Sequence, residues 1–183
     1  MLVYTAITSL DGFVADSEGS FEWSMPDAEV HGFINSLEST VGTYLLGRRM
    51  FEVMSAWETI DVAGLEPELV EFSALWHGID KIIYSTTLQD APTARSRIES
   101  SFDPESVRAL VAASPRDVAI AGPTLAAHAL RAGIVDEVRL FVSPVVVGGG
   151  IPAFSPGVSL DLELTESRRF ANGVVFSRFS AAR

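Results

Sequence analysis

The sequence predicts an α/β domain with a mostly parallel sheet that ends in antiparallel strands, and three observations support this class. Short apolar runs alternate with amphipathic segments of helical period, which is the pattern of repeated βα units. Residues 117–150 contain a complete strand–helix–strand crossover. Beyond this crossover, strands of alternating polarity flank Asn172-Gly173, a pair typical of a hairpin turn. We therefore expect one domain over residues 1–183, with several βα steps followed by a β-hairpin.

The crossover marks its own boundaries. Residues 117–121 are a short apolar run, residues 124–132 have helical period, and the chain is apolar again from Val135. Pro123 falls at the first helical position, where its missing N–H costs nothing, and Gly133 stands where a helix stop belongs. The free N–H groups at such a helix start attract anions, although many turns of this kind are only structural. The candidates for binding a phosphate or pyrophosphate are Gly122, Pro123, Thr124 and Leu125.

The other elements follow from hydrophobic period and turn residues. Residues 2–8 are almost continuously apolar, as in a strand buried on both faces, and we expect this strand near the centre of the sheet. Further strands are predicted at 43–46, 80–84, 138–142, 160–165 and 174–179, the last three as antiparallel edge strands, and helices at 25–38, from 48, at 65–76 and from 104. Residues 9–23 form a polar loop whose length is typical of a lid or binding loop.

The composition excludes several classes of function. Hydrophobic residues make up 48% of the 183 residues, enough for a large core, yet no apolar run approaches the roughly 20 residues of a membrane span. The formal net charge of −11 argues against nucleic acid as a partner. The first residues lack the basic start of a signal peptide, so we expect a cytoplasmic protein.

The sequence predicts no metal site. Cysteine is absent, which removes disulfides, thiolate metal sites and a cysteine nucleophile. The three histidines, His31, His77 and His128, are far apart in the sequence and do not suggest a cluster of ligands.

Three carboxylates are candidates for catalysis. Asp11 lies in the turn at residues 9–12, where it either bonds to its own backbone or contacts a ligand. Ser24 to Asp27 is a variant of the capping box, which places Asp27 and Glu29 in the first turns of the next helix. The helix dipole alone favours negative charge there, so a catalytic role for either is an alternative and not a requirement.

Two groups of polar side chains follow predicted strands. At Gly47-Arg48-Arg49 a strand passes through glycine into a helix, and guanidinium groups offer the planar fork of donors that suits phosphate. Two solvated arginines on an exposed turn are the alternative interpretation. Ser85, Thr86 and Thr87 come directly after the strand at 80–84. Because ligands of open α/β sheets gather beyond the carboxyl ends of the strands, these hydroxyls either bind phosphate or ribose oxygens or belong to an ordinary turn.

Four motifs give the chain a resemblance to a known family. They are Ser-Leu-Asp-Gly at 9–12, Leu-Gly-Arg-Arg at 46–49 followed by Phe51-Glu52, Gly-Pro-Thr-Leu at 122–125, and the block GIVDEVRLFVSPVVVGGGIPAF at 133–154. Together they resemble the dihydrofolate-reductase-like superfamily, and within it the reductase domain of riboflavin biosynthesis, the RibD C-terminal domain family. The resemblance implies a three-layer α/β/α fold and an NADPH-dependent reductase, often a homodimer, whose cofactor lies across the carboxyl ends of the strands.

The resemblance also implies roles for individual residues. Gly47 and Arg48 match the family's Gly-Arg at the cofactor phosphates, with Arg49 beside them. Ser85 and Thr86 match positions that help to select the adenosine 2′-phosphate, and Gly122 matches the first of the paired glycines near the pyrophosphate. The loop that covers nicotinamide and substrate in the family corresponds to Asp11 and Gly12, and the substrate pocket has Trp23, Phe33 and Phe141 as candidates, although core packing is the simpler role for Phe33.

Departures from the family pattern bear on geometry and substrate. Pro123 replaces the second glycine of a Gly-Gly bond that is cis in classical dihydrofolate reductases, and X-Pro bonds adopt cis at a cost of only about 0.5 to 1 kcal/mol. We therefore expect that Gly122-Pro123 is cis. Residues 58–72 contain no Arg or Lys to hold the glutamate of folate, and no zinc deaminase half is present.

Two hypotheses follow. In the first, the protein is an NADPH-dependent oxidoreductase that reduces a pyrimidine or pterin-like ring at a CH–NH, C=N or ribosylamino group, as in 5-amino-6-(5-phosphoribosylamino)uracil reductase; dihydrofolate reductase activity is an alternative of the same class. In the second, the protein is a dimer that binds a nucleotide on the same fold without turnover. Exposed apolar residues around 142–147 are the expected dimer interface, with burial inside one subunit as the alternative.

Overall fold

The computed structural model describes residues 1–90 and 93–182. The strands are β1 (Leu2–Thr8), β2 (Phe13–Ala15), β3 (Val41–Gly47), β4 (Asp80–Tyr84), β5 (Ser96–Glu99), β6 (Asp117–Ala121), β7 (Glu137–Val142), β8 (Ile151–Pro152), β9 (Leu162–Arg169) and β10 (Val175–Ala181). The helices are α1 (Ala28–Glu38), α2 (Arg48–Met54), α3 (Pro67–Gly78), α4 (Pro104–Ala113) and α5 (Pro123–Arg131), with 3-10 turns η1 (Glu22–Ser24) and η2 (Ser55–Glu58).

Eight of these strands form one mixed sheet in the order β5-β4-β3-β6-β1-β7-β10-β9. The strands from β5 to β7 are parallel to their neighbours, whereas β10 is antiparallel to both β7 and β9. The prediction of a mostly parallel sheet with an antiparallel end is thus confirmed, and β1 lies inside the sheet as expected. The prediction of β7 as an antiparallel edge strand is wrong, because β7 pairs in parallel with β1 from Glu137 to Val142.

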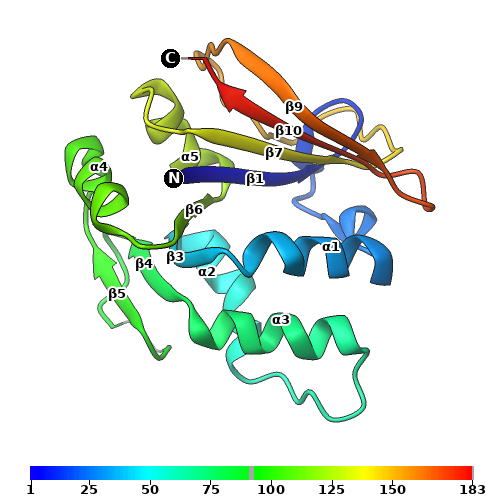
Figure 1. Ribbon diagram of the computed structural model, residues 1–183, viewed down its shortest axis with the longest axis horizontal. Coiled ribbons are helices and arrows are strands. Elements are labelled where there is room, and N and C mark those ends of the chain that lie inside the picture. The colour runs from blue at the N-terminus through cyan, green and yellow to red at the C-terminus, as the bar shows by residue number, and fades with distance from the viewer. Residues whose placement is uncertain (91–92, 183) are drawn as a thin grey trace.

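Helices cover both faces of the sheet and give the three-layer α/β/α arrangement. Figure 1 shows α1 and α3 on one face and α4 and α5 on the other. Alternate residues of β1 face these two layers: Tyr4 packs in the cluster that holds Val107 of α4 and Ala126 of α5, whereas Ile7 packs against the cluster that holds Val30 of α1. Burial of both strand faces explains why β1 reads as continuously apolar.

Several boundaries differ from the prediction. The loop at 9–23 contains β2, which pairs with β8 in a separate two-stranded sheet, and the turn η1. Strand β5 was not predicted because its sequence, SRIE, alternates over too few residues to stand out. Helix α1 begins at Ala28 and not at residue 25, because the Asp27 carboxylate accepts a hydrogen bond from the Val30 N–H at 3.0 Å and caps the helix there.

The cis prediction for Gly122-Pro123 is wrong. No cis peptide bond occurs in the described part of the chain. Gly122 instead turns the chain with φ +90° and ψ 125°, a conformation that residues with a side chain rarely adopt. Pro123 is the first residue of α5, as predicted from its place after the strand.

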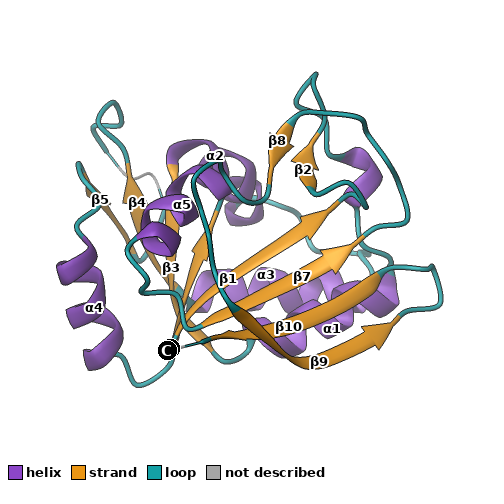
Figure 2. Cartoon of the chain, turned by 90° about the horizontal axis from the view of Figure 1, so that it is seen from above, coloured by secondary structure: helices purple, strands orange, loops and turns teal. Residues whose placement is uncertain are grey.

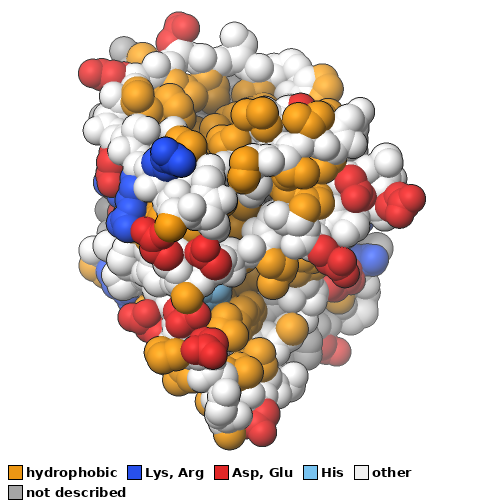
Figure 3. All heavy atoms as spheres, turned by 90° about the vertical axis from the view of Figure 1, so that its right-hand side faces the viewer, with side chains coloured by type: hydrophobic (Ala, Val, Ile, Leu, Met, Phe, Trp, Pro, Cys, Tyr) orange, Lys and Arg blue, Asp and Glu red, His pale blue; other side chains and the backbone are white. Residues whose placement is uncertain are grey.

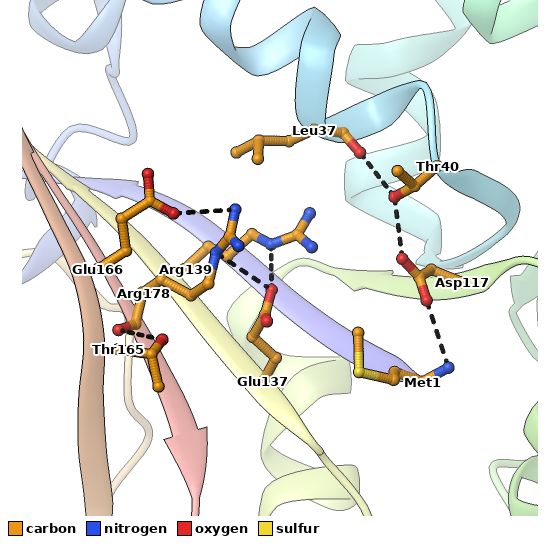
Figure 4. Close-up of polar contacts among 9 residues, drawn as sticks. All are labelled: Met1, Leu37, Thr40, Asp117, Glu137, Arg139, Thr165, Glu166 and Arg178. Atoms are coloured by element: carbon orange, nitrogen blue, oxygen red, sulfur yellow. Dashed lines mark hydrogen bonds and ion pairs between the residues drawn. The ribbon is translucent and has the colours of Figure 1, made fainter.

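Polar contacts at the amino-terminal edge of the sheet occupy several charged side chains (Figure 4). The buried Arg139 and the partly buried Arg178 both pair with Glu137, and Arg178 also pairs with Glu166 at 3.3 Å. The amino terminus lies 3.4 Å from the Asp117 carboxylate. Arg139 and Arg178 are therefore held in ion pairs within the fold, at the edge opposite the carboxyl ends of the parallel strands. None of the described helices is long and apolar enough to cross a membrane.

Candidate functional site

The parallel strands end along one edge of the sheet, and this edge collects the predicted site residues. Strand β1 leads to Ser9, β3 to Arg48, β4 to Ser85, β6 to Gly122 and β7 to Ser143. In Figure 2 the same edge carries α2 and the small β2–β8 sheet. The carboxyl ends of parallel strands are where open α/β sheets bind their ligands.

One part of this edge, the basic end, comprises residues 47–50, 85–88 and 122–125. Here the starts of α2 and α5 lie side by side. A Cβ placed on Gly47 would lie 3.8 Å from the Leu125 Cβ, and one on Gly122 would lie 3.4 Å from the Met50 Cβ. No side chain caps either helix start, so the N–H groups of both first turns are free of side-chain acceptors. Two adjacent uncapped helix starts are a suitable cradle for phosphate oxygens.

Basic and hydroxyl side chains border this cradle. Arg48 Nη1 donates a hydrogen bond to Thr87 Oγ1 at 3.0 Å, and Arg48 Nε lies 3.1 Å from the Glu52 carboxylate. The Arg49 side chain is exposed and has no ion pair or hydrogen bond with any described residue. Ser85 Oγ accepts hydrogen bonds from the backbone of Thr87 and Leu88, which fixes the turn, and Thr86 is exposed.

Two of the predicted cofactor residues have mainly structural surroundings, whereas Thr124 is exposed on the first turn of α5. The Leu125 side chain is buried in the core, and the Gly12 N–H donates to the Ser9 carbonyl while its own carbonyl accepts from the Ala153 N–H. Thr87 was named in the sequence only as part of a hydroxyl cluster. Its contact with Arg48 joins two segments far apart in the chain, which no local pattern reveals.

The second part of the edge is an uncharged cavity of about 300 Å³. It lies among the ends of β1 and β7, the segment that leads into α1, and the turn between β9 and β10. Its lining includes Ile7, Trp23, Met25, Val30, Ser143 and Asn172, and no charged side chain is found among the described residues that line it. We call this space the apolar cavity.

The predicted substrate residues divide between the apolar cavity and the core. Trp23 lines the cavity, and its indole N–H is buried with no hydrogen-bond partner in the described structure. Phe141 is fully buried, and Phe33 packs against it with ring centroids 6.1 Å apart and against Phe176 at 4.9 Å. Phe33 and Phe141 therefore belong to the aromatic core under α1, and neither lines the cavity.

None of the three candidate carboxylates lines the apolar cavity. The Asp11 carboxylate accepts hydrogen bonds from the backbone N–H groups of Val147 at 3.2 Å and Gly148 at 2.8 Å, and so ties the loop after β7 to the loop after β1. A hydrogen bond from Ser9, together with these backbone donors, holds the pKa of Asp11 below its ordinary value.

The other two carboxylates also have structural partners. Asp27 caps α1, as described above. Glu29 pairs with Arg168 at 3.1 Å and accepts a hydrogen bond from the Ala171 N–H at 3.0 Å, so it joins α1 to the β9–β10 hairpin. Among the described residues, no three His, Asp or Glu side chains come together in a way that could hold a metal ion.

The fold and the arrangement of the site define the class of protein. The fold is that of dihydrofolate reductase and its relatives: the chain superposes over its full length on 97% of Enterococcus faecalis dihydrofolate reductase complexed with NADP(H), with a TM-score of 0.64 and 14% identity. The chain belongs to the RibD C-terminal domain family, which matches residues 1–176. This confirms the resemblance seen in the sequence motifs.

Three other proteins are similar to this chain. The uncharacterized protein YyaP of Bacillus subtilis (strain 168) is 28% identical over 177 residues, which cover 95% of this chain and 91% of YyaP. A protein of Shewanella sp. PV-4 provisionally assigned to riboflavin biosynthesis superposes with a TM-score of 0.78 at 20% identity, with 100% and 99% of the two chains covered. The deaminase/5-amino-6-(5-phosphoribosylamino)uracil reductase of Thermotoga maritima superposes with a TM-score of 0.69 at 13% sequence identity. The superposition covers 100% of this chain and 56% of that chain.

Proposed function

We propose that the protein is an NADPH-dependent reductase that acts on a pyrimidine or pterin-like heterocycle. The observation that carries this proposal is the pair of uncapped helix starts at α2 and α5, bordered by Arg48 and placed on the same sheet edge as the apolar cavity. Membership of the RibD C-terminal domain family supports it. Bound NADPH would supply a hydride, and a proton from water would complete the reduction of a C=N or related group.

The residues of this chain have separate tasks in the proposal. The N–H groups at the starts of α2 and α5 hold the phosphates, and the guanidinium of Arg48 binds a phosphate oxygen in exchange for its present contacts with Thr87 and Glu52. The cavity walls orient a flat ring and exclude water. Because the pKa of Asp11 lies below its ordinary value, this carboxylate is ionised at neutral pH and is a poor proton donor.

The second candidate is a nucleotide-binding protein without turnover. One observation favours it: Asp11, Asp27 and Glu29 all lie outside the cavity lining and are bonded to the fold. If water supplies the proton, the reduction needs no carboxylate in the cavity, so this observation is also compatible with turnover. Reduction of folate is less well supported, because residues 58–72 contain no basic group for the glutamate tail.

We further propose that the protein is a cytoplasmic homodimer. Val146, in the segment expected to form the dimer interface, is 66% exposed.

Nucleotide binding tests the proposal. Titration calorimetry of NADPH and NADH is carried out on the wild type, on Arg48→Ala, and on Arg108→Ala as a control that removes a half-exposed arginine of α4. We expect preference for NADPH and an affinity at least about tenfold weaker in Arg48→Ala, the value of one charge-assisted hydrogen bond. Arg108→Ala binds like the wild type. Absence of binding of either nucleotide at millimolar concentration contradicts the proposal.

A further inference from the structure

Among the described residues, the lining of the apolar cavity has no group that could balance the charge of an anion. Its two ends come from segments without basic residues: residues 9–30 contain six acidic side chains and no Lys or Arg, and residues 143–158 contain neither acidic nor basic side chains. The strongest polar groups in its lining are therefore neutral, namely Ser143, Asn172 and the indole of Trp23. An anionic substituent placed here would meet a negative potential and no counter-charge.

The basic residues nearest in sequence to the cavity's hairpin turn are Arg168 and Arg169. Arg168 pairs with Glu29, and its guanidinium lies over the rings of Phe33 and Phe170 at 4.9 and 4.7 Å. Arg169 pairs across the sheet with Val175, whose neighbours in the chain face α1. Since side chains of a strand alternate between faces, Arg169 lies on the face away from α1 and the cavity.

The neutral groups of the cavity match a particular chemistry. The Trp23 N–H is a buried donor without a partner among the described residues, so it gains a hydrogen bond if the ring, which lines the cavity, turns toward a ligand carbonyl. The Asn172 side-chain oxygen already accepts from the Val174 N–H at 3.0 Å, which leaves its amide N–H groups as donors. The surroundings are apolar: Leu10, Met25 and Val146 are each about two thirds exposed, at 66, 69 and 66%. Figure 3, which views the side toward which β1 and β7 point, shows hydrophobic side chains gathered over this face with acidic groups around them.

We infer that the substrate of this protein is an uncharged, unphosphorylated ring compound with at least one carbonyl acceptor, and that the apolar cavity discriminates against the phosphate esters of the same ring. The inference rests on the proposed reductase function and concerns only its substrate half. A phosphomonoester carries a charge of about −1.5 to −2 at pH 7, so the discrimination is electrostatic in origin.

Three matched pairs of probes test this inference: 5-amino-6-(ribosylamino)uracil, uridine and riboflavin, each against its 5′-phosphate. Binding to the NADPH-saturated protein is measured by calorimetry. We expect at least one unphosphorylated probe to bind, at least about tenfold more tightly than its phosphate. Failure of all three unphosphorylated probes at millimolar concentration, or tighter binding of a phosphate, overturns the inference. Failure of NADPH itself to bind is a different result, since it removes the proposed function.

Two variants locate the discrimination in the cavity. Met25→Lys adds an ammonium group at an exposed lining position, and Leu164→Lys adds the same charge at an exposed position of β9 that does not line the cavity. We expect Met25→Lys to reduce the preference at least about fivefold and Leu164→Lys to leave it unchanged. Equal effects of the two substitutions contradict the inference. So does a wild-type preference for phosphate that Arg168→Gln abolishes, because Arg168 would then bind the anion.

Discussion

The basic end and the apolar cavity share one sheet edge but are built in different ways. The basic end uses backbone N–H groups at two helix starts and needs few side chains, chiefly Arg48. The apolar cavity uses side chains from β1, β7, the segment before α1 and the β9–β10 turn. A backbone cradle suits a ligand that is common to a whole family, whereas a wall of side chains can change with the substrate. The comparison predicts that substitutions at one end affect one ligand only.

The largest effect is expected from Gly122→Val. A side chain at φ +90° is strained, and its atoms beyond Cβ would enter the space between α5 and α2, where the Met50 Cβ already lies 3.4 Å from the Cβ position. We expect a loss of about 1 to 3 kcal/mol in the free energy of unfolding and NADPH affinity at least about tenfold weaker. Urea denaturation measures the free energy of unfolding, and calorimetry measures the NADPH affinity. Gly32→Ala, at a helical position with no atom within 4 Å, should retain both properties. If Gly122→Val bound NADPH as tightly as the wild type, the assignment of the basic end to the cofactor would be contradicted.

A smaller effect, confined to the cavity, is expected from Trp23→Phe. The substitution keeps an aromatic ring but removes the unpaired indole N–H. We expect binding of a carbonyl-bearing probe to weaken about threefold to tenfold, the value of one neutral hydrogen bond, while NADPH binding and thermal stability remain unchanged. Trp57→Phe, which changes a tryptophan that packs against Phe72 away from the cavity lining, serves as the control. A loss of NADPH affinity in Trp23→Phe would show that the two ends are not separate.

Asp11 links the two loops that adjoin the cavity, and its effect should depend on pH. Its pKa is lowered by folding, so its contribution to stability is present above the unfolded value of about 3.9 and is lost as the pH falls through the folded value. We expect Asp11→Asn to be less stable than the wild type at pH 7, and the difference to shrink as the pH falls below about 3.9. Hydrogen exchange at Val147 and Gly148 should quicken in the variant at pH 7. If the stability difference between the wild type and Asp11→Asn grew toward low pH, the assigned direction of the Asp11 pKa shift would be wrong.

The smallest effect is expected from Glu29→Gln. Glu29 and Arg168 are 43 and 44% exposed, and surface ion pairs of this kind contribute about 0 to 1 kcal/mol. The variant should unfold almost like the wild type. It also leaves Arg168 without its carboxylate, so phosphorylated probes should bind a few-fold better. A severe loss of turnover with intact folding would instead support the catalytic role considered for Glu29.

The sequence predicted most of the fold because its signals are local. The crossover at 117–142 shows its strand, glycine turn and helix in order, and the Asn172-Gly173 turn marks the hairpin that the structure contains. The two wrong expectations concern information that is not local. The direction of β7 depends on its pairing with β1, and the conformation at Gly122 is not specified by the residue types Gly-Pro alone.

The site was predictable to different extents at its two ends. Gly47, Arg48 and Gly122 stand directly at strand–helix junctions, so a pattern of single residues finds them. The lining of the cavity comes from four separate segments, and nothing in the sequence joins Ile7 to Asn172. Phe141 was a candidate for the pocket through the family resemblance, but alternation along β7 turns its ring into the core.

Amide chemical shifts during titration with NADPH test the central claim most directly. Two-dimensional ¹⁵N–¹H spectra report each backbone N–H separately. We predict the largest shifts at Arg48, Arg49, Thr124 and Leu125, in the first turns of α2 and α5, because these donors would meet the phosphates. Changes near Ile7 and Val174 should be smaller and should grow when a substrate is added. Saturable binding that leaves both helix starts unshifted would contradict the assignment of the basic end to the cofactor.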